Sequence, residues 1–296
     1  MGKVLRLRGV TITDTSAPKI ITRDKIESPG SLFLFDGNHQ FGTFAGLPAQ
    51  NAAIPNVLAN KAAAFLGVAE STVGLVVGGA TANSATWKSE RTTKGGVHGI
   101  ITQAGGQAGS PQYFIKTAPT IRNYVLANPT HKYYASMWIK VTRQSLKASS
   151  VMAPMYFIGP TTANQLFSFE GGIPSPISGP TLLGRKADPL LPDVPSQPLA
   201  VPYNRFGSVG VQGPIGVGPS ADSDISLVVG TAGAWAGGML NQAPSRIFYR
   251  AYMEDLTVSG RTYAEVEAID YALYQEAFGV GGKFYGDTYT APSALP

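Results

Sequence analysis

Two acidic residues, Glu254 and Asp255, are the best candidates for acid–base chemistry in the sequence. Glycoside hydrolysis uses a pair of carboxylates that flank the scissile bond. Adjacent residues of a β-strand point to opposite faces, so only one of these two carboxylates could serve. Its partner would have to come from another strand, and Glu170 and Glu90 are the candidates. The alternative interpretation of Glu254 is a solvated acidic edge near the basic half of a neighbour, and we assign no catalytic residue.

Other common chemistries lack their residues. His39, His98 and His131 are far apart, and none has a partner at the spacing of a zinc site. Cysteine is absent, which excludes disulfides, thiolate metal sites and a cysteine nucleophile. The sequence contains no Gly-x-Ser-x-Gly elbow, no Walker loop and no GxGxxG after a strand, so hydrolase and nucleotide-binding interpretations lose their usual support. We therefore expect no metal and no cofactor.

Three loop residues are candidates for ligand contact. Asp222 and Asp224 form a close acidic pair, but calcium requires 6–8 oxygen ligands and two carboxylates cannot define a site. A solvated turn is the simpler interpretation of this pair. Trp235 lies between glycines on a turn, and tryptophan is favoured at protein interfaces and on sugar-stacking surfaces. The alternative for Trp235 is that it folds back onto its own domain.

The N-terminal 70 residues predict an assembly segment made of a strand, an arm and a helix. Residues 4–13 alternate as a short basic edge strand that carries Arg6 and Arg8. Residues 14–30 lose this periodicity, which predicts a loop or an extended arm. The apolar run Ser31–Phe35 predicts a buried strand, and a turn signal follows it.

Two helices have clear boundaries. The stretch Pro55–Leu66 places apolar residues at helical spacing and is followed by Gly67, a typical stop. Thr262 and Glu265 have the spacing of a capping box, and a helix from about Tyr263 to Phe278 should follow them.

Residues 71–279 are predicted to be one unit, in which antiparallel β-structure dominates the part before the C-terminal helix. Apolar and polar residues alternate in short runs bounded by glycine, proline, asparagine or serine. Residues 171–219 interrupt the pattern with 10 of the 22 prolines and 9 glycines, so we expect a long surface excursion there. The glycines at every third position from Gly207 are interpreted as part of this loop. The expected strands are Thr72–Val77, Thr86–Arg91, His98–Thr102, Gln112–Thr117, His131–Val141, Val151–Ile158, Gln165–Phe169, Ile225–Gly230 and Arg246–Val258.

The C-terminal tail, residues 280–296, is rich in glycine, tyrosine and proline and has no periodicity, which predicts a second extended arm. Its aromatic residues join the basic residues of the first strand as candidates for contacts between subunits. The candidate assembly residues are Arg6, Arg8, Phe284, Tyr285 and Tyr289.

Composition favours assembly over nucleic-acid or membrane binding. Only 14% of the 296 residues are charged, against about 25% in an average soluble domain. Residues 1–150 hold 16 basic and 6 acidic residues, a net charge of +10, whereas residues 151–296 hold 7 and 12, a net charge of −5. Two halves of opposite net charge can attract one another between subunits and so steer the subunits together head to tail. The basic residues are scattered singly, and no apolar run approaches the ~20 residues of a membrane span.

The stretch Tyr252–Val266 resembles the last strand and turn of concanavalin A-like or laminin G-like jelly rolls, in which an alternating strand ends in a Ser-Gly-Arg turn and enters a helix. Leu5–Gly9, Leu32–Asp36 and the Ala-rich helix are similar to tail-associated structural proteins of tailed bacteriophages that contain such a module. This resemblance implies an antiparallel two-sheet β-sandwich of jelly-roll type, a virion location, and a role in assembly or host binding.

Our leading hypothesis is a non-enzymatic structural protein of a phage tail, baseplate or fibre. It would act as a homo-oligomer, for example a trimer, in contact with other virion proteins, without binding nucleic acid or inserting into a membrane. The first alternative is a receptor-binding module that recognises a host surface polysaccharide through Trp235 and residues 171–219. The second alternative is a polysaccharide-degrading enzyme that uses Glu254.

Overall fold

The computed structural model describes 11 segments of the chain, the first of which begins at residue 24 and the last of which ends at residue 295. For the strands between residues 155 and 228 it describes the backbone alone. The described ranges are 24–46, 51–79, 87–102, 113–128, 130–143, 155–158, 165–169, 182–189, 204–211, 226–228 and 245–295.

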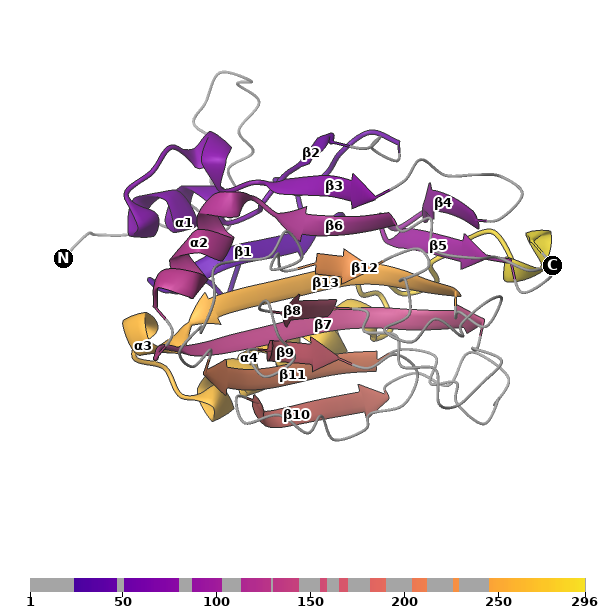
Figure 1. Ribbon diagram of the computed structural model, residues 1–296. Coiled ribbons are helices and arrows are strands. Elements are labelled where there is room, and N and C mark those ends of the chain that lie inside the picture. Colours follow the sequence, from indigo (N-terminus) through magenta and orange to yellow (C-terminus); the bar gives the residue numbers. More distant parts are fainter. Residues whose placement is uncertain are drawn as a thin grey trace, which may run out of the picture.

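The fold is mostly antiparallel β-sheet with four α-helices among the described residues. The larger sheet has seven strands in the order β10-β11-β7-β13-β5-β4, and β1 pairs with the other end of β13. The strand β13 is therefore the centre of this sheet, with three neighbours along its length (Figure 1). The seven strands are β1 (Ser31–Asp36), β4 (Trp87–Arg91), β5 (Val97–Ile101), β7 (Lys132–Arg143), β10 (Leu182–Pro189), β11 (Asn204–Val211) and β13 (Ser245–Asp255).

The smaller sheet has six strands in the order β2-β3-β6-β12-β8-β9 and lies in front of the larger sheet in Figure 1. Its neighbouring strands pair antiparallel throughout the described residues. The six strands are β2 (Ala53–Ile54), β3 (Leu75–Gly79), β6 (Tyr113–Thr117), β8 (Met155–Ile158), β9 (Gln165–Phe169) and β12 (Ser226–Val228).

The main hydrophobic core draws side chains from both sheets. Met137 and Phe248 of the seven-stranded sheet belong to one buried cluster with Leu75 and Ile115 of the six-stranded sheet. The helices α1 (Ala59–Leu66) and α2 (Pro119–Ala127) add alanine, isoleucine and valine side chains to this cluster at one end of the molecule (Figure 1). Burial of this apolar surface is the main stabilising contribution to the fold.

The other face of the seven-stranded sheet is covered by helix α4 (Tyr263–Phe278), which follows the short helix α3 (Leu256–Ser259). Trp138 of β7 packs against Tyr274 and Phe278 of α4, with ring centroids 5.6 and 6.2 Å apart. The helix lies behind the sheet in Figure 1, so the described elements form three layers: six strands, seven strands and a helix.

The predicted boundaries of both sequence-derived helices are largely confirmed. Thr262 and Glu265 form the capping box, and α4 ends at Phe278 before Gly279. Gly67 ends α1 in the left-handed conformation, which glycine adopts without a steric cost. The sequence analysis missed α2, whose only strong signal is Pro119 at its first turn, because no capping side chain marks its start.

The prediction that residues 171–219 form only a surface excursion is wrong. Two strands come from this segment, and β11 lies between β10 and β7 inside the seven-stranded sheet. The prolines do not prevent this pairing, because the run between Pro202 and Pro214 contains none, and every backbone amide in it can donate. Gly207 and Gly210 therefore belong to a strand and not to a loop.

The prediction of an extended C-terminal arm is also wrong. Phe284 is fully buried and packs on Tyr249 and Phe278, with ring centroids 4.7 and 5.3 Å away. Tyr249 donates a 2.9 Å hydrogen bond to Asp287, and Thr290 binds Glu90 of β4. The tail folds back because it carries an aromatic ring and polar groups that complement this face of the sheet.

We predict that Phe284→Ala lowers the free energy of unfolding by about 3–5 kcal/mol, because it removes a fully buried ring. The matched control is Tyr285→Ala, at an exposed neighbouring residue, which should change stability by less than about 0.5 kcal/mol. Urea unfolding followed by tryptophan fluorescence measures both. Equal effects of the two substitutions would contradict the placement of the tail.

Candidate functional site

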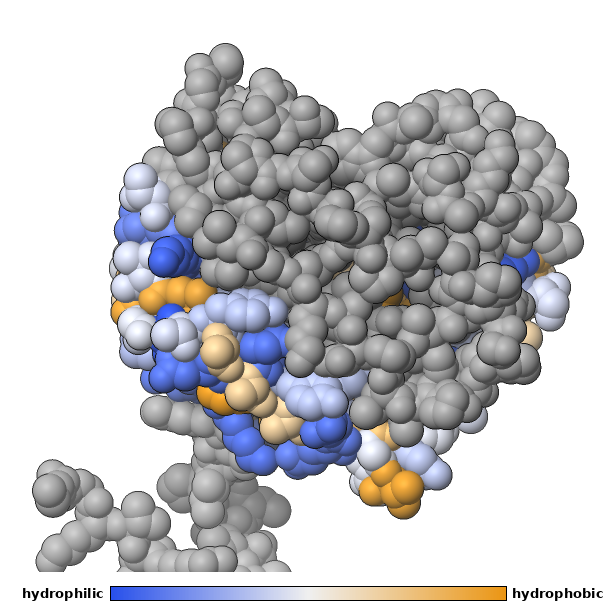
Figure 2. All heavy atoms as spheres, turned by 90° about the horizontal axis from the view of Figure 1, so that it is seen from below, coloured by the Kyte–Doolittle hydropathy of each residue, from blue (hydrophilic) through white to orange (hydrophobic). Residues whose placement is uncertain are grey.

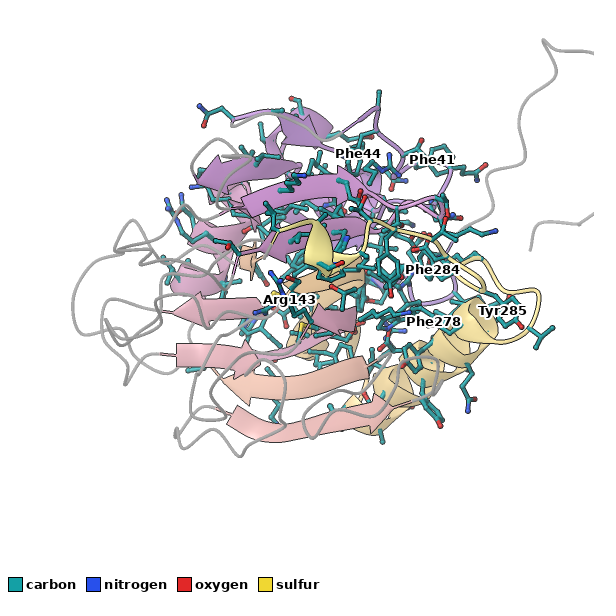
Figure 3. The ribbon with its side chains drawn as sticks, turned by 90° about the vertical axis from the view of Figure 1, so that its right-hand side faces the viewer. Phe41, Phe44, Arg143, Phe278, Phe284 and Tyr285 are labelled. Carbon is teal, nitrogen blue, oxygen red and sulfur yellow. The ribbon has the colours of Figure 1, made fainter. Side chains whose placement is uncertain are left out.

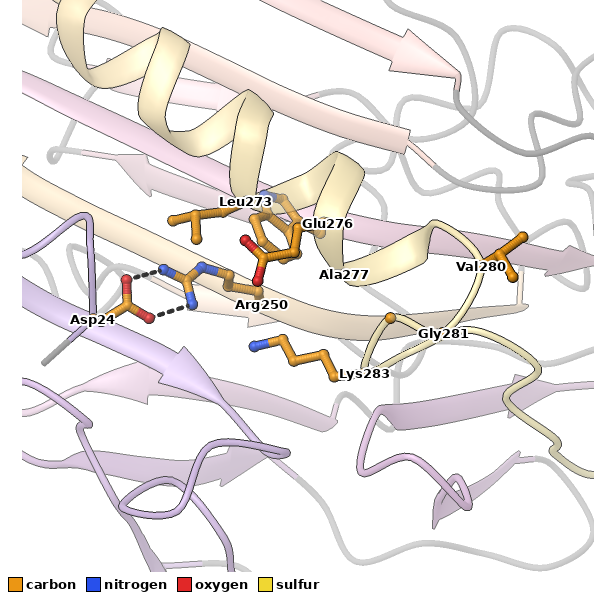
Figure 4. A pocket seen from close by; sticks show the side chains of 10 residues that line it. Asp24, Arg250, Leu273, Glu276, Ala277, Val280, Gly281 and Lys283 are labelled. Atoms are coloured by element: carbon orange, nitrogen blue, oxygen red, sulfur yellow. Dashed lines mark hydrogen bonds and ion pairs between the residues drawn. The ribbon is translucent and has the colours of Figure 1, made fainter. Parts of the chain in front are cut away.

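A cavity of about 360 Å³ lies where the end of α4, the middle of β13 and the start of the described chain meet (Figure 4). It opens on the face of the seven-stranded sheet that α4 covers. Charged side chains of both signs line it, together with one tryptophan ring. The lining residues are Asp24, Trp138, Arg250, Leu273, Glu276, Ala277, Val280, Gly281, Gly282 and Lys283.

Arg250 is the central group of this site. Its Nη1 and Nη2 donate to the two carboxylate oxygens of Asp24 at 2.9 and 2.8 Å, a bidentate pair. Nη1 also donates to Asp36 Oδ2 at 3.0 Å. The guanidinium carbon lies 4.9 Å from the centre of the Trp138 ring, within the range of a cation–π contact. Arg250 is buried, so these contacts replace the water that its charge would otherwise bind.

Lys283, which belongs to the C-terminal tail, supplies the second positive charge of the site. Its Nζ donates to Asp36 Oδ2, which Arg250 also binds. Burial lowers the pKa of Lys283 below its usual value, and the charge of Asp36 opposes this shift. Burial alone would raise the pKa of Asp24, but the charge and hydrogen bonds of Arg250 lower it to about 2. Two carboxylates and two cations therefore neutralise one another.

The chemistry available to this site is binding and positioning. The two carboxylates and the two cations form ion pairs with one another, so none of the four groups is a free acid, base or nucleophile. The rim adds Glu276, which forms a 3.0 Å ion pair with Lys25 at the surface. Within the described ranges no three His, Cys, Asp or Glu residues are grouped to hold a metal ion. The cavity is large enough for a small polar molecule, and Trp138 is one of the residues that line it.

Glu254, the candidate acid of the enzymatic alternative, lies in a separate network. It is fully buried and accepts hydrogen bonds from Tyr252 at 2.5 Å, from Ser259 at 2.7 Å and from Arg261. Arg261 binds both carboxylate oxygens. This is the geometry of a structural ion pair, because no lone pair is turned to a cleft.

Glu90, one of the two proposed partners of Glu254, has other partners. Glu90 binds His98 at 2.8 Å and Thr290 of the tail, and Glu170 lies outside the described residues. Asp255 has its own partners, as expected for adjacent strand residues. Its Oδ2 accepts from Tyr124 at 2.7 Å and is 2.6 Å from His131 Nδ1.

The Asp255 cluster also fixes the end of β13. Asp255 Oδ1 accepts from the backbone amides of Thr257 and Val258 and so caps α3. Burial and the carboxylate of Asp255 raise the pKa of Tyr124. Sequence reasoning missed this cluster, since its members are up to 131 residues apart and no local pattern joins them.

The candidate assembly residues have different positions. Phe284 is in the core, and Tyr289 packs on the ring of His98 and under the ammonium of Lys140. Tyr285 is 46% exposed and points away from the molecule, whereas Phe284 turns inward toward Phe278 (Figure 3). The other predicted site residues, Arg6, Arg8, Asp222, Asp224 and Trp235, lie outside the described residues.

In comparisons with known proteins, no protein-family model matches this chain, and no curated sequence matches it significantly. Among the residues that the structure describes, no helix has the length and apolar character needed to cross a membrane.

We predict that Arg250→Met lowers the free energy of unfolding by about 3–5 kcal/mol, because it leaves Asp24 and Asp36 without their main partner. Lys25→Met, which breaks an exposed ion pair nearby, is the control and should cost less than about 1 kcal/mol. Chemical unfolding measures both. An Arg250→Met protein as stable as the Lys25→Met protein would contradict a central role for Arg250.

The pKa of Asp24 predicts how stability depends on pH. Its folded pKa of about 2 is below the usual value of 3.8, so its ion pair stabilises the fold above about pH 4. As the pH falls through about 4 to 2, about 2 kcal/mol of this stability is lost. Asp24→Asn should therefore be less stable than wild type at neutral pH and should lose less stability on acidification. Parallel stability–pH profiles would rule this out.

Proposed function

We propose that this protein is a structural component of a tailed-phage virion, in the tail, baseplate or fibre, that works through protein–protein assembly as a homo-oligomer. The observation that carries the proposal is the turn of residues 280–286. Val280 is 89% exposed and Tyr285 is 46% exposed on this turn, while Phe284 between them is buried. An apolar pair is thus held at the surface on a fixed backbone.

A fixed turn of this kind suits a contact between subunits. Phe284 and the Lys283–Asp36 ion pair hold the backbone, so little conformational entropy is lost when a partner binds. Tyrosine is enriched at interfaces because it buries a large area and keeps a polar group. Seen from below (Figure 2), the coloured part of the surface carries small separate hydrophobic patches among hydrophilic side chains.

The charge of the N-terminal segment supports the same role. Asp24, the first described residue, lines the cavity that Val280 also borders. That segment carries Arg6 and Arg8, our candidate assembly residues. A basic segment of one subunit and the acidic second half of another would attract each other in a head-to-tail contact.

We also propose that the two sheets form a β-sandwich of the jelly-roll type. Their shared hydrophobic core and the antiparallel pairing support this arrangement. The resemblance of Tyr252–Val266 to concanavalin A-like modules supports it as well, since β13, the Gly260 turn and α4 follow one another as strand, turn and helix. The virion location rests on this resemblance.

A second candidate function is recognition of a host surface polysaccharide. The mixed-charge cavity beside Trp138 favours it, because carbohydrate sites combine polar groups with an aromatic ring. Binding of the purified protein to host cells discriminates this role from a purely architectural one, and no binding to any susceptible strain would count against it. The enzymatic alternative would require saccharide release from host envelope extracts, and the buried, paired carboxylate of Glu254 does not favour it.

We predict that Val280→Asp reduces the oligomeric state while the subunit still unfolds cooperatively, because it places a charge on the contact and leaves the core unchanged. Light scattering at micromolar concentrations measures the mass. The matched control is Val258→Asp on α3, where the valine is 39% exposed but away from the turn, and this variant should keep the wild-type mass.

Two results would reject the proposal. One is a wild-type protein that is a monomer in solution and is absent from purified particles by mass spectrometry. The other is an oligomer whose mass changes equally in the Val280→Asp and Val258→Asp proteins, which would place the contact elsewhere.

A further inference from the structure

The residues that line the cavity between α4, β13 and the start of the described chain differ in exposure. Trp138 and Arg250 are each 1% exposed, whereas Val280 is 89% exposed and the side chain of Glu276 is 68% exposed. The cavity thus reaches from buried residues to the surface. Its volume of about 360 Å³ is at the low end of the range for small-molecule sites, about 300–1,000 Å³. This size and depth suit one small unit that enters from the surface.

The two lining cations keep hydrogen-bond donors that the ion pairs do not use. Both Nη atoms of Arg250 bind the carboxylates of Asp24 and Asp36, but its Nε is buried and has no hydrogen-bond partner among the described residues. The Lys283 ammonium has three N–H groups, and in the described part of the chain it binds one carboxylate, that of Asp36. A ligand oxygen could therefore accept from both cations, which would satisfy a buried donor that is costly to leave unpaired.

The two lining carboxylates keep acceptor positions. A carboxylate can accept about four hydrogen bonds. Asp24 accepts two from Arg250 and one from the backbone amide of Ile26. Glu276 binds Lys25 through Oε2, and its Oε1 has no partner among the described residues. A ligand that donates hydrogen bonds could therefore bind both carboxylates.

The charges of the lining disfavour a charged ligand. The polar ends of four side chains point toward one another across the site, those of Asp24, Arg250, Glu276 and Lys283 (Figure 4). An anion that approached the two cations would also meet the two carboxylates, and a cation would meet the reverse arrangement. Like charges oppose binding more strongly where water is excluded. A hydroxyl group is uncharged and both donates and accepts, so a ligand with several hydroxyl groups matches both pairs.

Aliphatic side chains complete the lining. Leu273 and Ala277 belong to the last two turns of α4, and Val280 follows the helix. The guanidinium carbon of Arg250 lies 4.9 Å from the centre of the Trp138 ring and covers one face of it. The C–H groups of a ligand would therefore contact the three aliphatic side chains, and they would not need to stack on that face of the tryptophan.

We propose that this cavity binds one uncharged sugar unit at the end of a glycan chain. Arg250 and Lys283 would donate to its hydroxyl oxygens, and Asp24 and Glu276 would accept from its hydroxyl groups. The inference rests on the second candidate function, recognition of a host surface polysaccharide. It adds the class of sugar that is recognised, since units that carry a carboxylate or an amine are disfavoured, and it names the side chains that bind the sugar.

The test is saturation-transfer difference NMR of the full-length protein with methyl glucoside, methyl galactoside and methyl mannoside. The uronates of glucose and galactose and the amine glucosamine are the charged comparisons. We expect at least one uncharged sugar to bind in a titration. Its charged counterpart should bind at least about tenfold more weakly, because two carboxylates and two cations line the site.

Variants assign the binding to the cavity. Lys283→Met removes a donor and should abolish binding of the uncharged sugar. Glu276→Lys replaces an acceptor with a third cation, so it should weaken binding of the uncharged sugar and strengthen binding of its uronate. Glu276 is exposed, which keeps the test available if the Lys283→Met protein does not fold. Glu70→Lys, the same substitution at an exposed glutamate outside the cavity, is the matched control and should bind as wild type does.

Three results would overturn the proposal. The first is that none of the uncharged sugars binds. The second is that a uronate binds the wild-type protein as tightly as the uncharged sugar does. The third is that binding of the uncharged sugar is unchanged in the Glu276→Lys protein.

The failure of this proposal can be distinguished from that of the function on which it rests. Host-cell binding that persists in both the Lys283→Met and the Glu276→Lys proteins would place polysaccharide recognition elsewhere and reject this cavity alone. Sugar binding that meets the expectations above in a protein that binds no susceptible strain would count against polysaccharide recognition on the host and not against the cavity.

Discussion

The placement of residues 24–36 and of the C-terminal tail depends on the buried guanidinium of Arg250. Asp24 precedes the first described strand, Asp36 ends it, and Lys283 belongs to the tail, yet all three meet at this one side chain or its direct partner. Asp36 is also the cross-strand partner of Arg250, so the ion pair and the register of β1 on β13 require each other. Desolvation offsets much of the attraction within a buried ion pair, but removal of one partner leaves the other charge buried and unpaired, which is strongly destabilising.

An irregularity in β13 makes this arrangement possible. The pairing with β7 shifts between Phe248 and Arg250, which is the signature of a β-bulge. Consecutive residues of a regular strand face opposite sides, but here Tyr249 and Arg250 both serve the face that α4 and the tail cover. Tyr249 holds the tail through Asp287 and Phe284, and Arg250 holds the N-terminal segment. The opposite face of the same strand contributes Phe248, Ala251 and Met253 to the core between the sheets.

Local signals in the sequence predicted the fold better than the site. The capping box at Thr262, the glycine after α1 and the alternation of β7 act within a few residues, so they can be recognised in one chain without a structure. The tail could not be predicted, because Phe284 is held by residues from other elements. The same limit applies to Asp24 and Arg250, which are 226 residues apart and have no shared pattern. Proline content misled the prediction for β11, since the number of prolines matters less than where they lie.

Amide hydrogen exchange tests the central claim most directly, because it reports whether the two chain ends open with the sheet or separately from it. The amides of Gly282 and Phe284 donate to backbone carbonyls at the end of α4, and Asp24 and Asp36 bind Arg250 on β13. If Arg250 holds residues 24–36 and the tail on the sheet, the tail amides should exchange at rates close to those of β13. Arg250→Met should then accelerate exchange in residues 24–36 and in residues 280–287 together. Tail amides that exchange as fast as a free peptide in the wild-type protein would contradict the account.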